Sequence, residues 1–139
     1  MKPLIPGNIL QRNCKRINNE YVHLEYLNMK KLIDFTVTEN KRLNHDTILL
    51  VLHSEELPEI QPGQFVNVRV DHSPSTFLRR PISVHDVDEA RGLLYLFIKI
   101  VGCGTSTLGD LQIGDKVNVM LPLGNHFSIP ASGRPLLIG

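Results

Sequence analysis

Residues 79–106 read RRPISVHDVDEARGLLYLFIKIVGCGTS, and this stretch decides the fold. Its two runs rich in apolar residues, 81–85 and 93–101, each have the length and composition of a β-strand. The polar residues 86–92 between them have the composition of a hairpin turn. The stretch therefore predicts two consecutive strands, of which the first begins at a proline.

Four more runs predict strands on either side of this pair. Ile33, Phe35 and Val37 alternate with polar residues, which is typical of a strand with one buried face. The run at 47–53 is almost entirely apolar and predicts a strand covered on both sides. The other two runs are 66–70 and 117–121. Six short strands, with one short helix expected near residues 106–111, predict an all-β barrel or sandwich.

The composition restricts the class of protein. Fifteen basic and fourteen acidic side chains nearly cancel, so we expect no broad surface for nucleic acid or membrane, and any anion site must be local. Cys14 and Cys103 have neither the number nor the spacing of a disulfide framework or an iron–sulfur site. No run approaches the roughly 20 apolar residues of a membrane helix. These features predict one cytoplasmic domain.

The two ends of the chain differ from its middle. Residues 1–28 show no lasting period and predict a weakly ordered N-terminal extension, with a helix or hairpin at 20–27 as the alternative. Residues 29–133 would then form the barrel. The apolar run 134–139 ends in glycine, as the first strand of a dinucleotide-binding domain does. We expect it to begin such a domain, here truncated, unless it is a last barrel strand.

The start of the strand at 81–85 carries groups that suit a phosphorylated, planar ligand. Arg80 offers a fork of donors for a diphosphate, and Pro81 holds the chain extended. Ser83 lies on the opposite face from Arg80 if the pleat is regular, so a twist or bulge beside Pro81 would be needed to bring both to one ligand. The alternative is an edge strand that begins with proline and follows two solvated arginines.

The turn Gly102-Cys103-Gly104-Thr105-Ser106 supplies the second group of candidate residues. Glycines let backbone amides approach an anion, and hydroxyls follow at the entrance of the expected short helix. The alternative is an ordinary loop with a threonine or serine N-cap. Cys103 has no partner thiol or basic neighbour in the sequence, which favours a small packed side chain over a redox role. Together the turn and the strand contain the parts needed to hold a flavin nucleotide.

The order of these motifs resembles a known family. Pro62-Gly63-Gln64-Phe65, the Arg-Pro-Ile-Ser strand, the turn with Gly104-Thr105 and finally Pro122-Leu123-Gly124 follow one another at its spacing. Over residues 29–139 the chain is similar to the FAD-binding barrel of the ferredoxin–NADP reductase superfamily. Within that superfamily it most closely resembles the electron-transfer subunit of bacterial dihydroorotate dehydrogenase. The resemblance implies a six-stranded antiparallel Greek-key FAD-binding barrel with one short helix.

The resemblance also implies three groups of FAD-binding residues. One group contacts the diphosphate, a second lines the isoalloxazine ring, and a third lies along the ribityl chain and the ring. The diphosphate group is Arg80, Gly104, Thr105 and Ser106, and the ring group is Pro81, Ile82 and Ser83. The group along the ribityl chain and the ring is Phe97, Ile98 and Lys99. No residue is assigned to catalysis or to a metal.

The function implied by the resemblance is electron transfer in pyrimidine biosynthesis. An FAD-binding subunit would pass reducing equivalents between NAD(H), an iron–sulfur centre and the dihydroorotate dehydrogenase catalytic subunit, in a hetero-oligomer. The NAD and 2Fe–2S sites are expected only beyond Gly139, so the 139 residues alone would lack full activity. The alternatives are the FAD domain of another NAD(P)H-linked reductase, such as a sulfide dehydrogenase or hydrogenase-associated diaphorase, and a cofactor-free β-barrel binding module.

Overall fold

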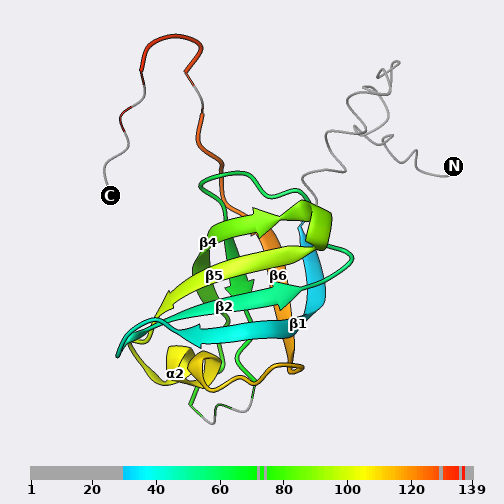
Figure 1. Cartoon of the computed structure of the whole chain (residues 1–139), viewed down its shortest axis with the longest axis vertical. Helices are drawn as coiled ribbons and strands as arrows, with labels where there is room; N and C mark the ends of the chain where they lie inside the picture. Colours follow the sequence, from blue (N-terminus) through cyan, green and yellow to red (C-terminus); the bar gives the residue numbers. More distant parts are fainter. Residues whose placement is uncertain (1–29, 72, 74, 129, 135, 137–139) are drawn as a thin grey trace, which may run out of the picture.

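The structure is a computed structural model that describes residues 30–139, apart from 72, 74, 129, 135 and 137–139. The expected extension at residues 1–28 therefore lies outside the described residues. Within the described residues, six strands form a closed barrel, accompanied by one α-helix and one 3-10 turn (Figure 1). The elements are β1 (Lys31–Arg42), β2 (Thr47–His53), β3 (Phe65–Val68), β4 (Arg80–Asp88), η2 (Glu89–Arg91), β5 (Leu93–Lys99), α2 (Cys103–Gly109) and β6 (Lys116–Leu123).

The barrel has Greek-key topology. Its strand order is β1-β2-β5-β4-β3-β6, and β6 pairs with β1 to close it. Every neighbouring pair is antiparallel. Strands β3, β4 and β5 form a meander, and β6 returns to lie beside β3, which is the Greek-key arrangement. This order confirms the expected six-stranded barrel and excludes the sandwich.

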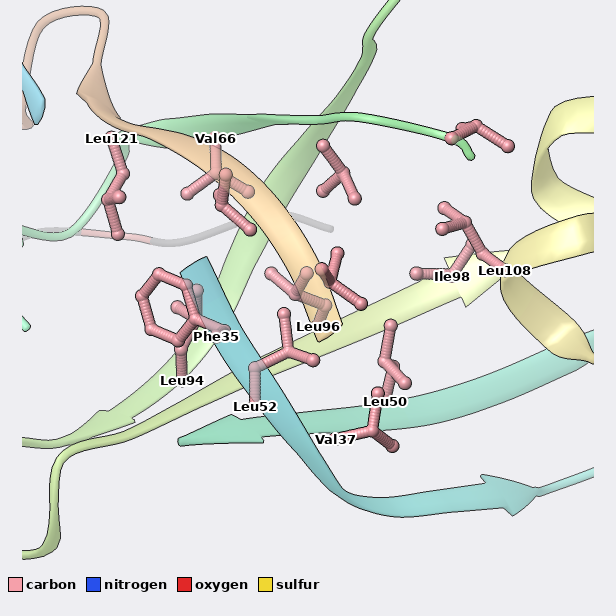
Figure 2. Close-up of a cluster of buried hydrophobic side chains, with 14 of the residues drawn as sticks. Phe35, Val37, Leu50, Leu52, Val66, Leu94, Leu96, Ile98, Leu108 and Leu121 are labelled. Atoms are coloured by element: carbon pink, nitrogen blue, oxygen red, sulfur yellow. The ribbon is translucent and has the colours of Figure 1, made fainter. Parts of the chain in front are cut away.

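The core fills the inside of the barrel, where buried side chains of β1, β2, β3, β5, β6 and α2 meet (Figure 2). Partly buried side chains of β4 pack against them. Ile33, Phe35 and Val37 of β1 are at most 4% exposed, as their alternation predicts. In β2, Leu50 points into the core while Val51, on the other face, is also buried. The almost continuous apolar sequence of β2 is thus explained by burial on both faces.

The turn between β4 and β5 is tighter than predicted. β4 continues to Asp88, so only η2 and Gly92 remain of the expected turn at 86–92. The Asp88 carboxylate accepts a hydrogen bond from the Arg91 amide, which starts the 3-10 turn. Gly92 has φ 62° and leads into β5; a side chain there would be strained in this conformation.

Helix α2 covers one end of the barrel (Figure 1). Leu108 is its buried anchor, only 1% exposed, and it lies beside Ile98 of β5 (Figure 2). The helix begins at Cys103, three residues before the expected start at 106, and ends at Gly109. No helix in the described part of the chain has the length and apolar character needed to cross a membrane.

The C-terminal end is described only in part. Arg134 and Leu136 lie outside any strand, and Leu136 is 82% exposed. The remaining residues of the expected strand at 134–139, which are 135 and 137–139, lie outside the described residues.

Candidate functional site

Arg80 and the glycine turn line one cavity. This hollow of about 440 Å³ lies between the start of β4 and the start of α2, and Gly104 and Thr105 form part of its wall. A Cβ on Gly104 would stand 2.7 Å from Nε of Arg80 and 3.2 Å from Cγ2 of Thr76. The guanidinium group can lie against the turn only because residue 104 has no side chain.

The Thr105 hydroxyl organises the turn. Its Oγ1 accepts hydrogen bonds from the amides of Val101 (2.9 Å) and Gly102 (3.2 Å) and donates to the Gly102 carbonyl (3.0 Å). The N-cap itself is Gly102 in an extended conformation, so the alternative of a threonine or serine N-cap is wrong. The Thr105 amide has no backbone acceptor within the described residues, so it can donate to a ligand.

The residues present fit a diphosphate. The first intrahelical bond of α2 runs from the Ser106 amide to the Gly102 carbonyl, so the amides of Cys103, Gly104 and Thr105 have no partner in the helix. Phosphate oxygens are good acceptors for such amides and for a guanidinium fork. The cavity combines both kinds of donor with a glycine that leaves room for the ligand.

The two neighbouring arginines have different surroundings. Arg79 donates from Nη1 to the carbonyls of Asn67 (3.2 Å) and Asn118 (3.1 Å), and its Nη2 donates to the Asn118 side chain. These bonds join β3 to β6. Arg79 is therefore a structural residue and Arg80 the cavity residue, which corrects the alternative of two solvated arginines.

Ring-binding candidates lie on the outer face of the barrel. Pro81, Ser83 and His85 are exposed on β4, and Phe97 of β5 is 50% exposed. The rings of His85 and Phe97 lie 5.7 Å apart at 38°. These side chains give β4 and β5 a continuous outer surface that a planar group could cover.

Two isoleucines of the candidate set face inward. Ile98 is 1% exposed and belongs to the core, while Ile82 is half-buried and packs against it. Their side chains stabilise the barrel, so Ile98 could meet a ligand on the outer face only through its backbone. A sequence pattern alone does not separate the backbone role from the side-chain role at these two positions.

The register of β4 settles how Arg80 and Ser83 are related. β4 pairs with β3 without a shift from Arg80 to Ser83, and the first irregularity lies between Val84 and Asp86. No bulge beside Pro81 brings both side chains to one face. A single ligand that contacts both must run from the cavity at the barrel end onto the outer face, which requires an elongated molecule such as a dinucleotide.

Lys99 takes part in a charged group at the end of β5. Its Nζ lies 3.5 Å from Oδ2 of Asp46. A hydrogen bond from the Thr47 hydroxyl, with the nearby His45 and Lys99 charges, lowers the pKa of Asp46 from its usual value. Asp46 thus stays ionised and holds Lys99 beside the turn between β1 and β2. Ser106, by contrast, is exposed on α2.

Sequence reasoning missed two residues of this region. Thr76 is 7% exposed and contacts the Gly104 side of the cavity, although it comes from the loop between β3 and β4. Asn40 of β1 bonds to the Leu108 and Gly109 carbonyls at the end of α2. Neither lies in a motif, and only the folded chain brings them there. Within the described ranges, no three histidine, cysteine, aspartate or glutamate side chains gather as a metal site would require.

Comparison with known proteins agrees with this geometry. Residues 34–127 match the oxidoreductase FAD-binding domain family. A protein of Desulforamulus reducens named dihydroorotate dehydrogenase B (NAD(+)), electron transfer subunit, is 35% identical over 111 residues, which cover 79% of this chain and 42% of that protein. The protein of the same name from Bacillus caldolyticus is 39% identical over 108 residues, 75% of this chain and 42% of that protein.

Solved structures share the fold. An NADH-dependent reduced ferredoxin-NADP oxidoreductase superposes with a TM-score of 0.61 at 29% identity, covering 68% of this chain and 34% of that one. The ferredoxin reductase of carbazole 1,9a-dioxygenase superposes with a TM-score of 0.66 at 23% identity, over 76% and 32% of the two chains, and shows the fold alone. The chain spans about two-fifths of the length of the curated relatives it matches.

Proposed function

The chain belongs to the oxidoreductase FAD-binding domain family, and from that premise we propose that it binds one FAD between the α2 turn and the outer face of β4 and β5. The observation that carries this proposal is the contact of Arg80 with Gly104 inside a cavity lined by the free end of α2. A cation, unpaired amides and a missing Cβ meet there, and each suits a phosphate oxygen.

Each group of residues has a different task in this proposal. Arg80 neutralises the diphosphate, and the amides of Gly104 and Thr105 orient it. Pro81, Ser83 and Phe97 would hold the ring against the barrel, and the Ser83 hydroxyl would hydrogen-bond to the ring near its reactive nitrogen. Flavin, when bound, supplies hydride and single-electron chemistry that no side chain of the protein can provide. The chain contributes binding, orientation and exclusion of water from one face of the ring.

The wider function follows from the relatives. We propose that the chain is the FAD-binding part of an electron-transfer subunit in pyrimidine biosynthesis. That subunit would pass reducing equivalents between NAD(H), a 2Fe–2S centre and the dihydroorotate dehydrogenase catalytic subunit in a cytoplasmic hetero-oligomer. The support is the 33–39% identity to proteins named as that electron transfer subunit. Residues 134–139 would begin the NAD-binding domain, and the cluster ligands would belong to the longer protein.

A second candidate function is the FAD domain of another NAD(P)H-linked reductase. The likeness to the NADH-dependent ferredoxin-NADP oxidoreductase, at 29% identity, favours it. Both candidate functions use the same FAD-binding residues and differ in the protein that exchanges electrons with the flavin. The alternative of a cofactor-free binding module has no support from the family match.

Co-purification separates the two candidates. The full-length gene product is expressed with the dihydroorotate dehydrogenase catalytic subunit of its own organism, and the mixture is analysed by size-exclusion chromatography. A complex that contains FAD and reduces NAD⁺ with dihydroorotate as donor is expected. A flavin-loaded protein that elutes alone and transfers electrons to ferredoxin instead would favour the second candidate.

A further inference from the structure

A side chain of β1 holds the far end of helix α2. Nδ2 of Asn40 lies within hydrogen-bond distance of the carbonyl oxygens of Leu108 (3.2 Å), Gly109 (3.2 Å) and Leu111 (2.9 Å). These residues form the last turn of α2 and the chain just after it, where carbonyls have no partner within the helix. Asn40 thus caps the C-terminal end of the helix whose other end carries the glycine turn.

A β-bulge directs Asn40 toward the helix. Val37 lies opposite Leu52 and Asn40 opposite Leu50, and both leucines are fully buried in the core. The register shifts between Val37 and Glu39, so one extra residue enters β1. In a regular strand Asn40, three residues after Val37, would lie on the opposite face. The bulge instead places it on the core-facing side, at the end of the barrel that α2 covers.

The Asn40 amide has no competing task in the described part of the chain. Its Oδ1 is buried there without a hydrogen-bond partner, so the bonds of Nδ2 alone fix the side chain. The helix itself spans seven residues, too few to be stable without outside contacts. Its anchors are the buried Leu108 side chain and the amide of Asn40.

We propose that Asn40 is a positioning residue for the diphosphate turn, a role that rests on the FAD site proposed above. Seven helical residues span only about 10 Å, so a displacement at the C-terminal end of α2 reaches its N-terminal end. Without Asn40 the amides of Gly104 and Thr105 move relative to Arg80, which is fixed on β4. The outer face of β4 and β5, which meets the ring, does not depend on α2.

Two ligands distinguish this role from a general loss of structure. FAD carries the diphosphate, whereas riboflavin keeps the ring and the ribityl chain without it. For Asn40→Ala we expect FAD affinity to fall about threefold to tenfold, the effect of one to two neutral hydrogen bonds, and riboflavin affinity to change by less than about twofold. Both are measured by quenching of flavin fluorescence on the full chain.

Thr38→Val provides the matched control. The Thr38 hydroxyl donates to the Val51 carbonyl (3.2 Å) from the same bulge without contacting α2. Its loss should leave the ratio of FAD to riboflavin affinity unchanged. In the ligand-free chain, the NMR amide signals of Gly104 and Thr105 should move in Asn40→Ala and stay in place in Thr38→Val.

The outcomes separate the two proposals. Equal losses for FAD and riboflavin, or none, in a folded variant would overturn the role of Asn40, as would unmoved amide signals of Gly104 and Thr105. If Asn40→Ala fails to fold, Asn40→Ser keeps one donor and is judged by the same ratio. A wild-type chain without FAD affinity would instead contradict the FAD site itself. If the wild type binds FAD and the ratio of FAD to riboflavin affinity is unchanged in Asn40→Ala, only the positioning role of Asn40 is contradicted.

Discussion

Arg80 lies across Gly104, with its Nε 2.7 Å from the position that a Cβ on residue 104 would occupy. One residue begins β4 and the other opens α2, so this contact joins the strand to the glycine turn. Arg80 is also the positively charged side chain that lines the cavity.

Replacing Gly104 by alanine should weaken FAD binding without unfolding the protein. The added methyl displaces the flexible Arg80 side chain and presses on the buried Thr76 methyl group, 3.2 Å away, which offsets the gain in helix propensity of up to about 1 kcal/mol. Thr107→Ala is the matched control, because Thr107 lies in the same helix, its hydroxyl donates to the Cys103 carbonyl, and it does not line the cavity. Calorimetric titration with FAD and thermal unfolding give both quantities. Equal FAD affinity in the two variants would contradict the role of the Gly104 contact.

Replacing Arg79 should lower the stability of the ligand-free protein more than replacing Arg80. Arg79→Ala removes three hydrogen bonds from the Arg79 side chain to β3 and β6 and should lower the free energy of unfolding by about 1–3 kcal/mol. Arg80→Ala removes a side chain of the cavity and should change it by less than about 0.5 kcal/mol. Urea unfolding of the ligand-free protein measures both. A larger loss for Arg80→Ala than for Arg79→Ala would reverse the assignment.

Thr105 should matter for the ligand-free turn. Thr105→Val loses the hydroxyl that bonds Val101, Gly102 and the Gly102 carbonyl, and should cost about 1–2 kcal/mol of stability. Thr105→Ser keeps the hydroxyl and should restore most of it. The adjacent exposed Ser106 serves as control, since Ser106→Ala should have little effect. Thermal unfolding compares the three variants, and equal stabilities would show that the hydroxyl does not hold the turn.

Ser83 should affect the ring and leave the fold unchanged. Its side chain is exposed on the outer face of β4, so Ser83→Ala should alter stability by less than about 0.5 kcal/mol. Loss of one hydrogen bond to the ring should weaken FAD and riboflavin alike, by about 0.5–1.5 kcal/mol. The visible absorption spectrum of bound flavin should shift as well. A variant with the wild-type spectrum and wild-type affinity for both ligands would remove Ser83 from the ring site.

Most of the fold can be predicted from the sequence, but fewer features of the candidate site can. Strict alternation at Ile33, Phe35 and Val37 predicts a strand because each apolar residue fills the same core, and the structure confirms it. The same alternation fails for Asn40, because a bulge depends on pairing with β2 and leaves no mark in β1 alone. Arg79 and Arg80 are identical side chains in the sequence, and only long-range contacts with β3, β6 and α2 distinguish them.

Residues 1–28 give a prediction that rests on barrel closure. β1 pairs with β6 from Lys31 opposite Leu121, and the ring of six strands is complete within the described residues. If the preceding residues are an extension, their deletion should change the melting temperature by no more than about 3 °C, or roughly 0.5 kcal/mol. Differential scanning calorimetry of the two proteins measures this. A drop well beyond that range would show that the segment packs on the barrel.

Titration of the ligand-free chain with FAD shows whether Arg80 and the glycine turn bind the cofactor. Flavin fluorescence is followed for the wild type and for Arg80→Ala at one salt concentration. We expect saturation at one FAD per chain and a loss of about 1.5–3 kcal/mol in binding free energy for Arg80→Ala, the value of a charge-assisted hydrogen bond. A wild-type chain that does not bind FAD, or equal affinity in the two proteins, would show that Arg80 and the turn do not form an FAD site.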